Sequence, residues 1–202
     1  MEELLCTLYN QHETEDIVVV TYSNKRAYVY NQEIRHRILY KEELISSGDF
    51  VIAVKNNYFW IKDDAEVGFL ANGDNMEILS INKIQELYGF HFADVDIQLM
   101  DYDNTPTLSV KILLETLHSE APALTDDENK RLYHAVEEDY LDIPRATDRR
   151  KAMRENPYFN ALQVKYGYAL TCHKTQGGQW RNVFVEAPYL PEEDTLGLND
   201  LR

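Results

Sequence analysis

The side chains best suited to chemistry in this chain of 202 residues are gathered in one segment, 166–180. It reads as a strand that ends in a polar loop with two adjacent glycines, Gly177 and Gly178. Glycine permits positive φ and close backbone approach, and successive backbone amides can face an anion. Taken alone, the loop is equally compatible with an anion or nucleotide contact and with a structural turn. Hydrogen-bonding side chains surround the glycines: Thr171, His173, Lys174, Gln176 and Gln179.

Other reactive patterns are incomplete. Residues 101–104 (DYDN) begin like a calcium loop, but Pro106 stands where that loop needs glycine. The histidines show no HExxH spacing, and no Gly-x-Ser-x-Gly elbow surrounds Ser23. Cys172 precedes His173, but neighbours along an extended chain point to opposite faces. We therefore predict neither a catalytic residue nor a metal site within this chain.

A strand and a helix early in the chain are expected to position the loop. Residues 17–20 (IVVV) form an apolar run typical of a buried strand. Ser23 and Asn24 follow at once and can cap a helix, and apolar residues recurring at every fourth position predict that helix over 24–40. A strand, a tight turn and a capped helix form the repeating unit of an α/β fold. The turn sits at the carboxyl end of its strand, where open α/β sheets bind ligands.

The middle of the chain predicts a different architecture. About five or six short strands with little helix between them are expected from Gly48 onward. A small, partly closed β-barrel over 48–120, inserted into an α/β domain that starts as 1–47, is the economical interpretation. The predicted strands cover 50–54, 58–61, 68–70, 76–81, 95–99 and 108–114.

A helical segment is expected over 121–160. Thr125 and Glu128 have the spacing of a capping box, and a basic run from Arg145 to Arg154 follows. Such a run is more often a solvated helix face than a binding site. Residues 163–171 are predicted to form one strand that re-enters the sheet, so that 161–202 returns to the α/β domain.

The charge balance limits the class of partner. Lys and Arg number 20 against 35 Asp and Glu, a net charge of −15. This argues against a free-standing nucleic-acid binder but permits contact through a local basic patch. Cys6 and Cys172 have no metal-binding spacing, no apolar run could span a membrane, and the N-terminal residues show no signal-peptide pattern. We expect a cytoplasmic protein with reduced thiols and no membrane partner.

Two segments resemble motifs of superfamily-one DNA helicases. Residues 168–177 (YALTCHKTQG), followed by the strand 183–185 (VFV), resemble motif V of RecD-like enzymes and of the related UvrD-type C-terminal domain. Residues 20–27 (VTYSNKRA) and 30–35 (YNQEIR) resemble motif IV. The resemblance implies a RecA-like second motor domain of the P-loop NTPase type, interrupted by a small SH3-like β-barrel and a helical segment.

The resemblance also implies roles for individual residues. Motif IV offers Arg26 or Arg35 as the contact to a nucleotide phosphate, and Arg26 is preferred because it lies closer to the turn. Related helicases often carry a glutamate at the position of Gln179, which weakens any role there that needs a charge. The implied nucleotide-binding residues are Arg26, Gln176, Gly177 and Gln179, and the implied DNA-binding residues are Ser23, Asn24, Thr171, His173 and Lys174.

No Gly-x-x-x-x-Gly-Lys-Ser/Thr string occurs, so the chain has no phosphate loop. We therefore expect the C-terminal portion of an ATP-dependent DNA helicase, cut at both ends and inactive alone. ATP and Mg²⁺ would be shared with the N-terminal motor domain of the same full-length chain, and single-stranded DNA would be the partner. The alternative is a non-catalytic nucleic-acid-binding or protein-interaction module that uses the barrel.

Overall fold

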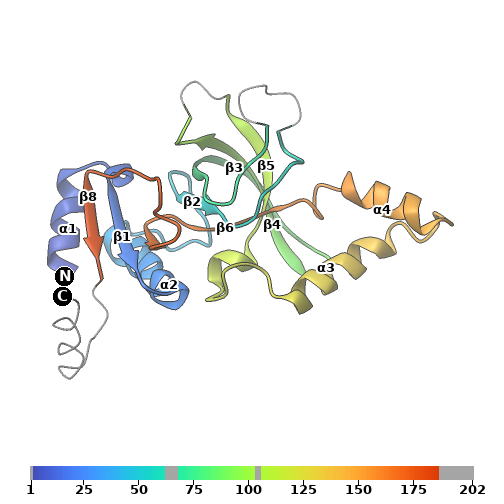
Figure 1. Cartoon of the computed structure of the whole chain (residues 1–202), viewed down its shortest axis with the longest axis horizontal. Helices are drawn as coiled ribbons and strands as arrows, with labels where there is room; N and C mark the ends of the chain where they lie inside the picture. Colours follow the sequence, from blue (N-terminus) through green and yellow to red (C-terminus); the bar gives the residue numbers. More distant parts are fainter. Residues whose placement is uncertain (1, 62–67, 103–105, 187–202) are drawn as a thin grey trace, which may run out of the picture.

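The computed structural model describes residues 2–61, 68–102 and 106–186. It has a mixed α/β architecture in two adjoining parts (Figure 1). A small sheet with helices α1 and α2 lies at one end of the molecule, a β-barrel lies in the middle, and helix α4 lies at the other end. One hydrophobic core runs through both parts, since Val19 and Ala169 of the sheet belong to the same buried cluster as Met76 and Val164 of the barrel.

The sheet has three parallel strands in the order β7-β1-β8. β1 (Ile17–Thr21) lies between β7 (Ala169–Thr171) and β8 (Asn182–Val185), so chain segments about 150 residues apart become neighbours. β1 is buried along its whole length, as the apolar run predicted. Helix α1 (Glu2–Gln11) and a short 3-10 turn (Thr14–Asp16) precede it.

Helix α2 (Asn24–Glu33) begins where the sequence predicted. Ser23 is its N-cap, and the Ser23 Oγ accepts a hydrogen bond from the backbone N–H of Arg26 at 3.2 Å. The helix continues into a π-helical turn, η2 (Ile34–Ile38). The wider turn changes the direction of the side chains at the end of the predicted helix, and Ile34 and Arg35 are both buried there.

The barrel is closed by five strands in the order β2-β3-β4-β5-β6. Antiparallel pairing between the first and last strands closes it, for example at Val51 and Tyr166. The predicted short strands at 58–61 and 68–70 are replaced by one isolated bridge between Asn57 and Leu70. A barrel is confirmed, but the prediction was of a partly closed barrel over 48–120, whereas the observed barrel is closed and takes its last strand from residues 162–166. The strands are β2 (Phe50–Ala53), β3 (Asn75–Leu87), β4 (Phe90–Leu99), β5 (Leu108–Leu113) and β6 (Leu162–Tyr166).

The expected helical segment is present between β5 and β6. It contains the 3-10 turn η3 (Glu115–His118), helix α3 (Asp126–Glu138) and helix α4 (Ala146–Arg154). The capping box is confirmed, because the Thr125 N–H donates to Glu128 Oε2 at 2.8 Å and the Glu128 N–H donates to Thr125 Oγ1 at 3.3 Å. Both helices pack on the barrel and form a second buried cluster with it. Its buried members are Phe90, Phe92 and Leu113 of the barrel, Leu132 and Val136 of α3, Met153 of α4, and Leu124, which lies just before α3.

The prediction of one strand over 163–171 is wrong. The segment is two strands that pair with different partners, because β6 completes the barrel and β7 joins the sheet. Gly167 lies between them, and its N–H donates to the carbonyl of Phe50 at 2.8 Å. A β-carbon at Gly167 would lie 3.5 Å from the Phe50 backbone, so the chain passes close to β2 at the crossing. The boundary between barrel and sheet therefore falls at residues 167–168.

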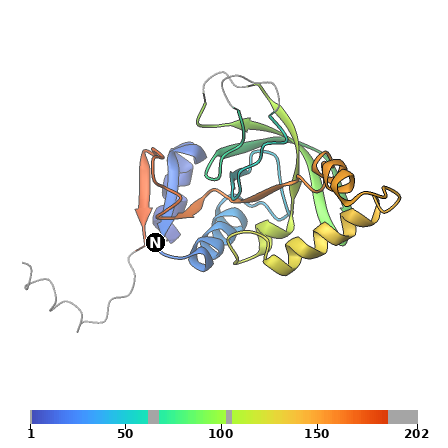
Figure 2. The ribbon, with the colours of Figure 1, turned by 45° about the vertical axis from the view of Figure 1, so that its right-hand side comes forward.

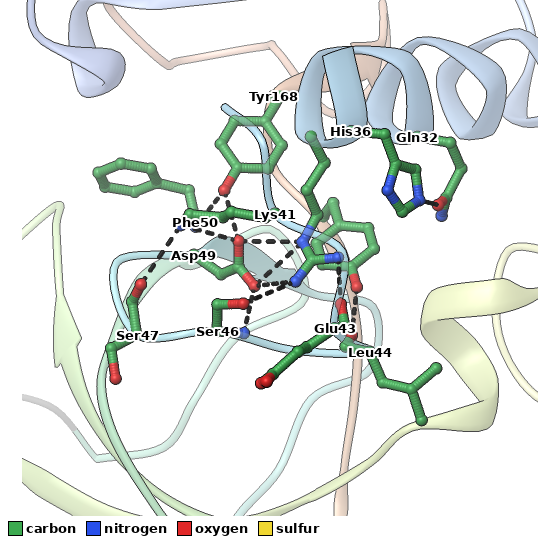
Figure 3. A network of polar contacts seen from close by, with 12 residues as sticks. Gln32, His36, Lys41, Glu43, Leu44, Ser46, Ser47, Asp49, Phe50 and Tyr168 are labelled. Carbon is green, nitrogen blue, oxygen red and sulfur yellow. Dashed lines mark hydrogen bonds and ion pairs between the residues drawn. The ribbon is translucent and has the colours of Figure 1, made fainter. Parts of the chain in front are cut away.

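A buried ion pair connects η2, the turn that follows α2, to the start of the barrel (Figure 3). The Arg35 guanidinium donates to both carboxylate oxygens of Asp49 at 3.0–3.1 Å, and both side chains are at most 1% exposed. Tyr168, which lies just before β7, donates its hydroxyl to Asp49 Oδ1 at 2.8 Å, and Lys41 Nζ lies 3.0 Å from the same oxygen. The Arg35 guanidinium also lies 4.8 Å from the centre of the Tyr166 ring. These contacts fix the sheet against the barrel.

Candidate nucleic-acid interface

The loop 172–181 leaves the carboxyl end of β7 and remains on the surface of the molecule. Its first turn is closed by its own backbone, since the Lys174 N–H donates to the carbonyl of Thr171 at 2.8 Å. The Gly178 N–H donates to the carbonyl of Thr175 at 3.2 Å, so this amide does not face outward toward an anion. Gln176 and Gly177 are exposed at the apex. The structure thus presents the loop openly but uses part of its backbone internally.

Glycine is required at each of the two loop positions, 177 and 178, for a different physical reason. Gly177 has a φ of +88°, a conformation that residues with a β-carbon rarely adopt. Gly178 lies against the indole ring of Trp180, and a β-carbon there would be 2.1 Å from the ring atom Cη2. Trp180 in turn packs on the buried side chains Val18 and Leu170, on one face of the sheet. The glycine pair therefore lets the loop fold back on its own tryptophan.

A cleft between the sheet and the barrel brings together three of the predicted DNA-binding residues. Asn24 from the first turn of α2, Thr171 from the end of β7 and Lys174 from the loop all line it. The opposite wall includes Ser119 and Lys165, which come from the segment after η3 and from β6. Figures 1 and 2 both show the segment after η3 running beside α2. The cleft therefore opens at the carboxyl ends of β1 and β7, beside the N-terminus of a helix.

The other two predicted DNA-binding residues lie near this cleft but do not line it. Ser23 is half-buried, and its side-chain oxygen is occupied by the cap of α2. His173 is exposed on the loop between Thr171 and Lys174. The five predicted DNA-binding residues thus lie close together, and Ser23 among them serves as the N-cap of α2.

The cleft contains two half-buried lysines. Lys174 Nζ donates to Asn72 Oδ1 of the barrel at 3.1 Å, and burial lowers the pKa of Lys174. Lys165 Nζ donates to the backbone carbonyl of Ser119. Burial, together with the nearby positive charge of Lys174, lowers the pKa of Lys165 to about 8. Sequence reasoning missed Lys165, because outward-facing lysines on barrel strands are ordinary and only the packing of the sheet places this one in a cleft.

Arg26 lies at the carboxyl end of the sheet but is already paired. Its Nε donates to Glu186 Oε1, just after β8, at 2.7 Å, and its guanidinium lies 5.2 Å from the centre of the Tyr30 ring. The hydrogen bond to Glu186 raises the pKa of Arg26. The other oxygen of Glu186, Oε2, is buried and accepts no hydrogen bond within the described structure. Arg35, the alternative motif IV arginine, is fully buried against Asp49 and is not accessible to a nucleotide.

The structure does not bring the predicted nucleotide-binding residues together. Gln179 lines a cavity of about 270 Å³ that includes Asp16, Ile17 and Asp101, near the amino end of β1. Arg26 lies at the opposite end of that strand, and the two residues line different cavities. Within the described ranges, no group of three or more His, Cys, Asp or Glu side chains could hold a metal ion. These residues do not by themselves form a site that fits ATP with Mg²⁺.

Comparison with known proteins gives a match that falls on the segment containing the loop 172–181. Residues 166–200 match the family model of the UvrD-like helicase C-terminal domain, and no curated protein matches the chain. The match includes β7, the loop and β8, and its remainder, 187–200, lies outside the described residues. No helix in the described part of the chain is long and apolar enough to cross a bilayer. Residues 166–200 are therefore similar to the C-terminal domain of UvrD-like helicases, and this match supports a C-terminal fragment of a UvrD-type superfamily-one helicase.

Proposed function

We propose that this chain is the C-terminal portion of an ATP-dependent DNA helicase of the RecD-like type. The sheet would be a RecA-like second motor domain, and the barrel an SH3-like insertion. Three observations support this proposal: the parallel order β7-β1-β8, the insertion of the barrel between α2 and β7, and the family match over 166–200. Single-stranded DNA and the N-terminal motor domain of the same full-length protein are the proposed partners.

The observation that carries the proposal is the position of the loop 172–181. It begins at the cleft lined by Asn24, Thr171 and Lys174 and ends near the cavity lined by Gln179. A hydroxyl, an amide and an ammonium in one cleft can bind backbone phosphates without reading sequence. Such local contacts are compatible with a net charge of −15, because only the cleft has to attract the strand.

We propose that the loop couples the two ligands. Trp180 holds one end of the loop on the sheet, and Lys174 attaches the other end to Asn72 of the barrel. A shift of the loop would therefore change the DNA cleft and the surroundings of Gln179 together. ATP and Mg²⁺ would bind where this chain meets the N-terminal motor domain, and Arg26 is the positive side chain that this chain would offer to the phosphates.

Replacing Thr171 with alanine tests the DNA cleft. We expect the affinity of the 202-residue chain for fluorescein-labelled oligo(dT) to fall. The expected loss is roughly two- to tenfold, which corresponds to the net contribution of one typical hydrogen bond. Fluorescence anisotropy over a salt titration measures the affinity, and circular dichroism checks that the fold is retained. Thr7→Ala on the exposed face of α1 is the matched control. Equal affinity of wild type and Thr171→Ala at every salt concentration would remove Thr171 from the interface.

An ATPase assay tests whether this chain can hydrolyse ATP without the N-terminal motor domain. We expect no DNA-stimulated ATP hydrolysis by the 202-residue chain, because its sequence has no phosphate loop to hold the β- and γ-phosphates. Phosphate release is measured with and without oligo(dT). Robust ATP hydrolysis that depends on DNA would contradict the proposal. DNA binding without ATP hydrolysis is the result expected for a helicase portion and is not expected for an unrelated enzyme.

A further inference from the structure

Among the described residues, the two lysines of the cleft have no negatively charged partner. Lys165 comes from β6 of the barrel and Lys174 from the loop of the sheet, yet both line the same cleft. The hydrogen-bond acceptors of their ammonium groups are neutral oxygens, the Ser119 carbonyl and Asn72 Oδ1. In the described part of the chain, no carboxylate lies within ion-pair distance of either one.

This arrangement is unfavourable without an anion. Burial opposes the charged form of each lysine, and the charge of Lys174 adds to the effect on Lys165. Glu128 acts in the opposite direction on Lys165, but only from a distance. In a chain with 35 acidic residues, unpaired and half-buried lysines facing one cleft are unexpected unless a ligand supplies the negative charge.

We propose that Lys165 and Lys174 together form a binding site for a phosphodiester of single-stranded nucleic acid, so that the barrel holds the strand jointly with the sheet. This inference rests on the proposed function and adds a residue to it. Asn24, at the start of α2, lines the same cleft and brings the positive end of a helix close to the anion. The strand would then contact both parts of the molecule at one point.

The densest run of basic residues in the chain, 145–154, is the alternative location for a phosphodiester-binding site. It lies on α4, at the end of the molecule away from the sheet (Figure 1). Arg149 in this run already donates to the carbonyl of Ile143 at 3.1 Å and lies 3.7 Å from Glu137. Arg149 is therefore engaged within its own segment, whereas Arg150 and Arg154 are exposed on the helix surface. Lys151 on the same helix is exposed and offers a charge-matched control.

The test compares Lys165→Met, Lys165→Arg and Lys151→Met in the 202-residue chain. With oligo(dT) of about 12 nucleotides, we expect Lys165→Met to weaken binding roughly three- to tenfold at low salt. The slope of log affinity against log salt concentration should become shallower by about 0.7, the value for one lost phosphate contact with a single strand. Lys165→Arg should retain most of the affinity, and Lys151→Met should change neither quantity. Thermal melts confirm that each variant is folded.

A second measurement separates failure of this inference from failure of the proposed function. Inorganic pyrophosphate is titrated into the wild-type chain while the lysine side-chain signals are followed by NMR. Joint shifts of Lys165 and Lys174, with Lys151 unmoved, support the site whether or not the chain binds DNA. Unmoved Lys165 and Lys174 signals overturn it. Wild-type affinity and slope in Lys165→Met overturn it as well and leave the role of Thr171 standing.

Discussion

Replacing Asp49 with alanine is expected to lower the free energy of unfolding by about 3–5 kcal/mol, the cost of leaving one partner of a buried ion pair unpaired. The Arg35 guanidinium would remain without its carboxylate in a position that is 0% exposed. The Tyr168 hydroxyl and the backbone N–H of Ser46 would each lose an acceptor, now at 2.8 and 2.7 Å. Urea unfolding followed by circular dichroism measures the change.

Asp127→Ala on α3 is the control for this prediction. Its carboxylate is 94% exposed and lies 3.7 Å from Lys130, so removing it should change the free energy of unfolding by less than about 1 kcal/mol. Removing both buried charges at once, in Arg35→Met with Asp49→Leu, should be less harmful than Asp49→Ala, because no fully buried ion is left unpaired and the remaining Lys41 side chain is 19% exposed. A loss below about 1 kcal/mol for Asp49→Ala would mean that water or another group reaches Arg35.

The Asp49 contacts also bear on function. The carboxylate of Asp49, just before β2, links Arg35 in η2 and Tyr168 just before β7, so it joins the two connections by which the chain passes between sheet and barrel. We therefore expect Asp49→Ala to loosen the cleft formed by those two parts in addition to lowering stability.

Replacing Gly178 with alanine is expected to release the loop from the sheet. The new methyl carbon would lie 2.1 and 2.4 Å from two atoms of the Trp180 ring, so the indole or the backbone must move. Overpacking of this kind costs roughly 1–3 kcal/mol. We expect the indole N–H signal of Trp180 to shift in NMR spectra and oligo(dT) binding to weaken more than in Thr171→Ala, because the whole loop is displaced.

A double-mutant cycle identifies the cause of this effect. Trp180→Ala removes the ring that the new methyl group would strike, so Gly178→Ala should be much less harmful in that background. Gly68→Ala is the matched control, since a β-carbon there meets nothing within 4 Å and its φ is not positive. Full additivity of the two loop substitutions would show that the contact between Gly178 and Trp180 does not hold the loop in place.

The sequence by itself determined those features that depend on neighbours along the chain. The cap of α2 at Ser23 and the capping box at Thr125 were predicted correctly because each is closed by hydrogen bonds across three residues. The buried strand β1 was evident from its unbroken apolar run. The loop after Thr171 was found because its motif is contiguous in sequence, and the family match falls on the same residues.

Only the tertiary structure decided which distant segments meet. The alternation over 163–171 continues through Gly167, although β6 and β7 pair with strands in different sheets. Arg35 and Arg26 both occur in the motif IV segment, yet Arg35 is buried in an ion pair with Asp49 and Arg26 forms an ion pair with Glu186. Lys165 enters the cleft only because the sheet packs against the barrel beside it. In each case the partner is more than ten residues away, and strand pairing and charge burial depend on that partner, which a local pattern does not specify.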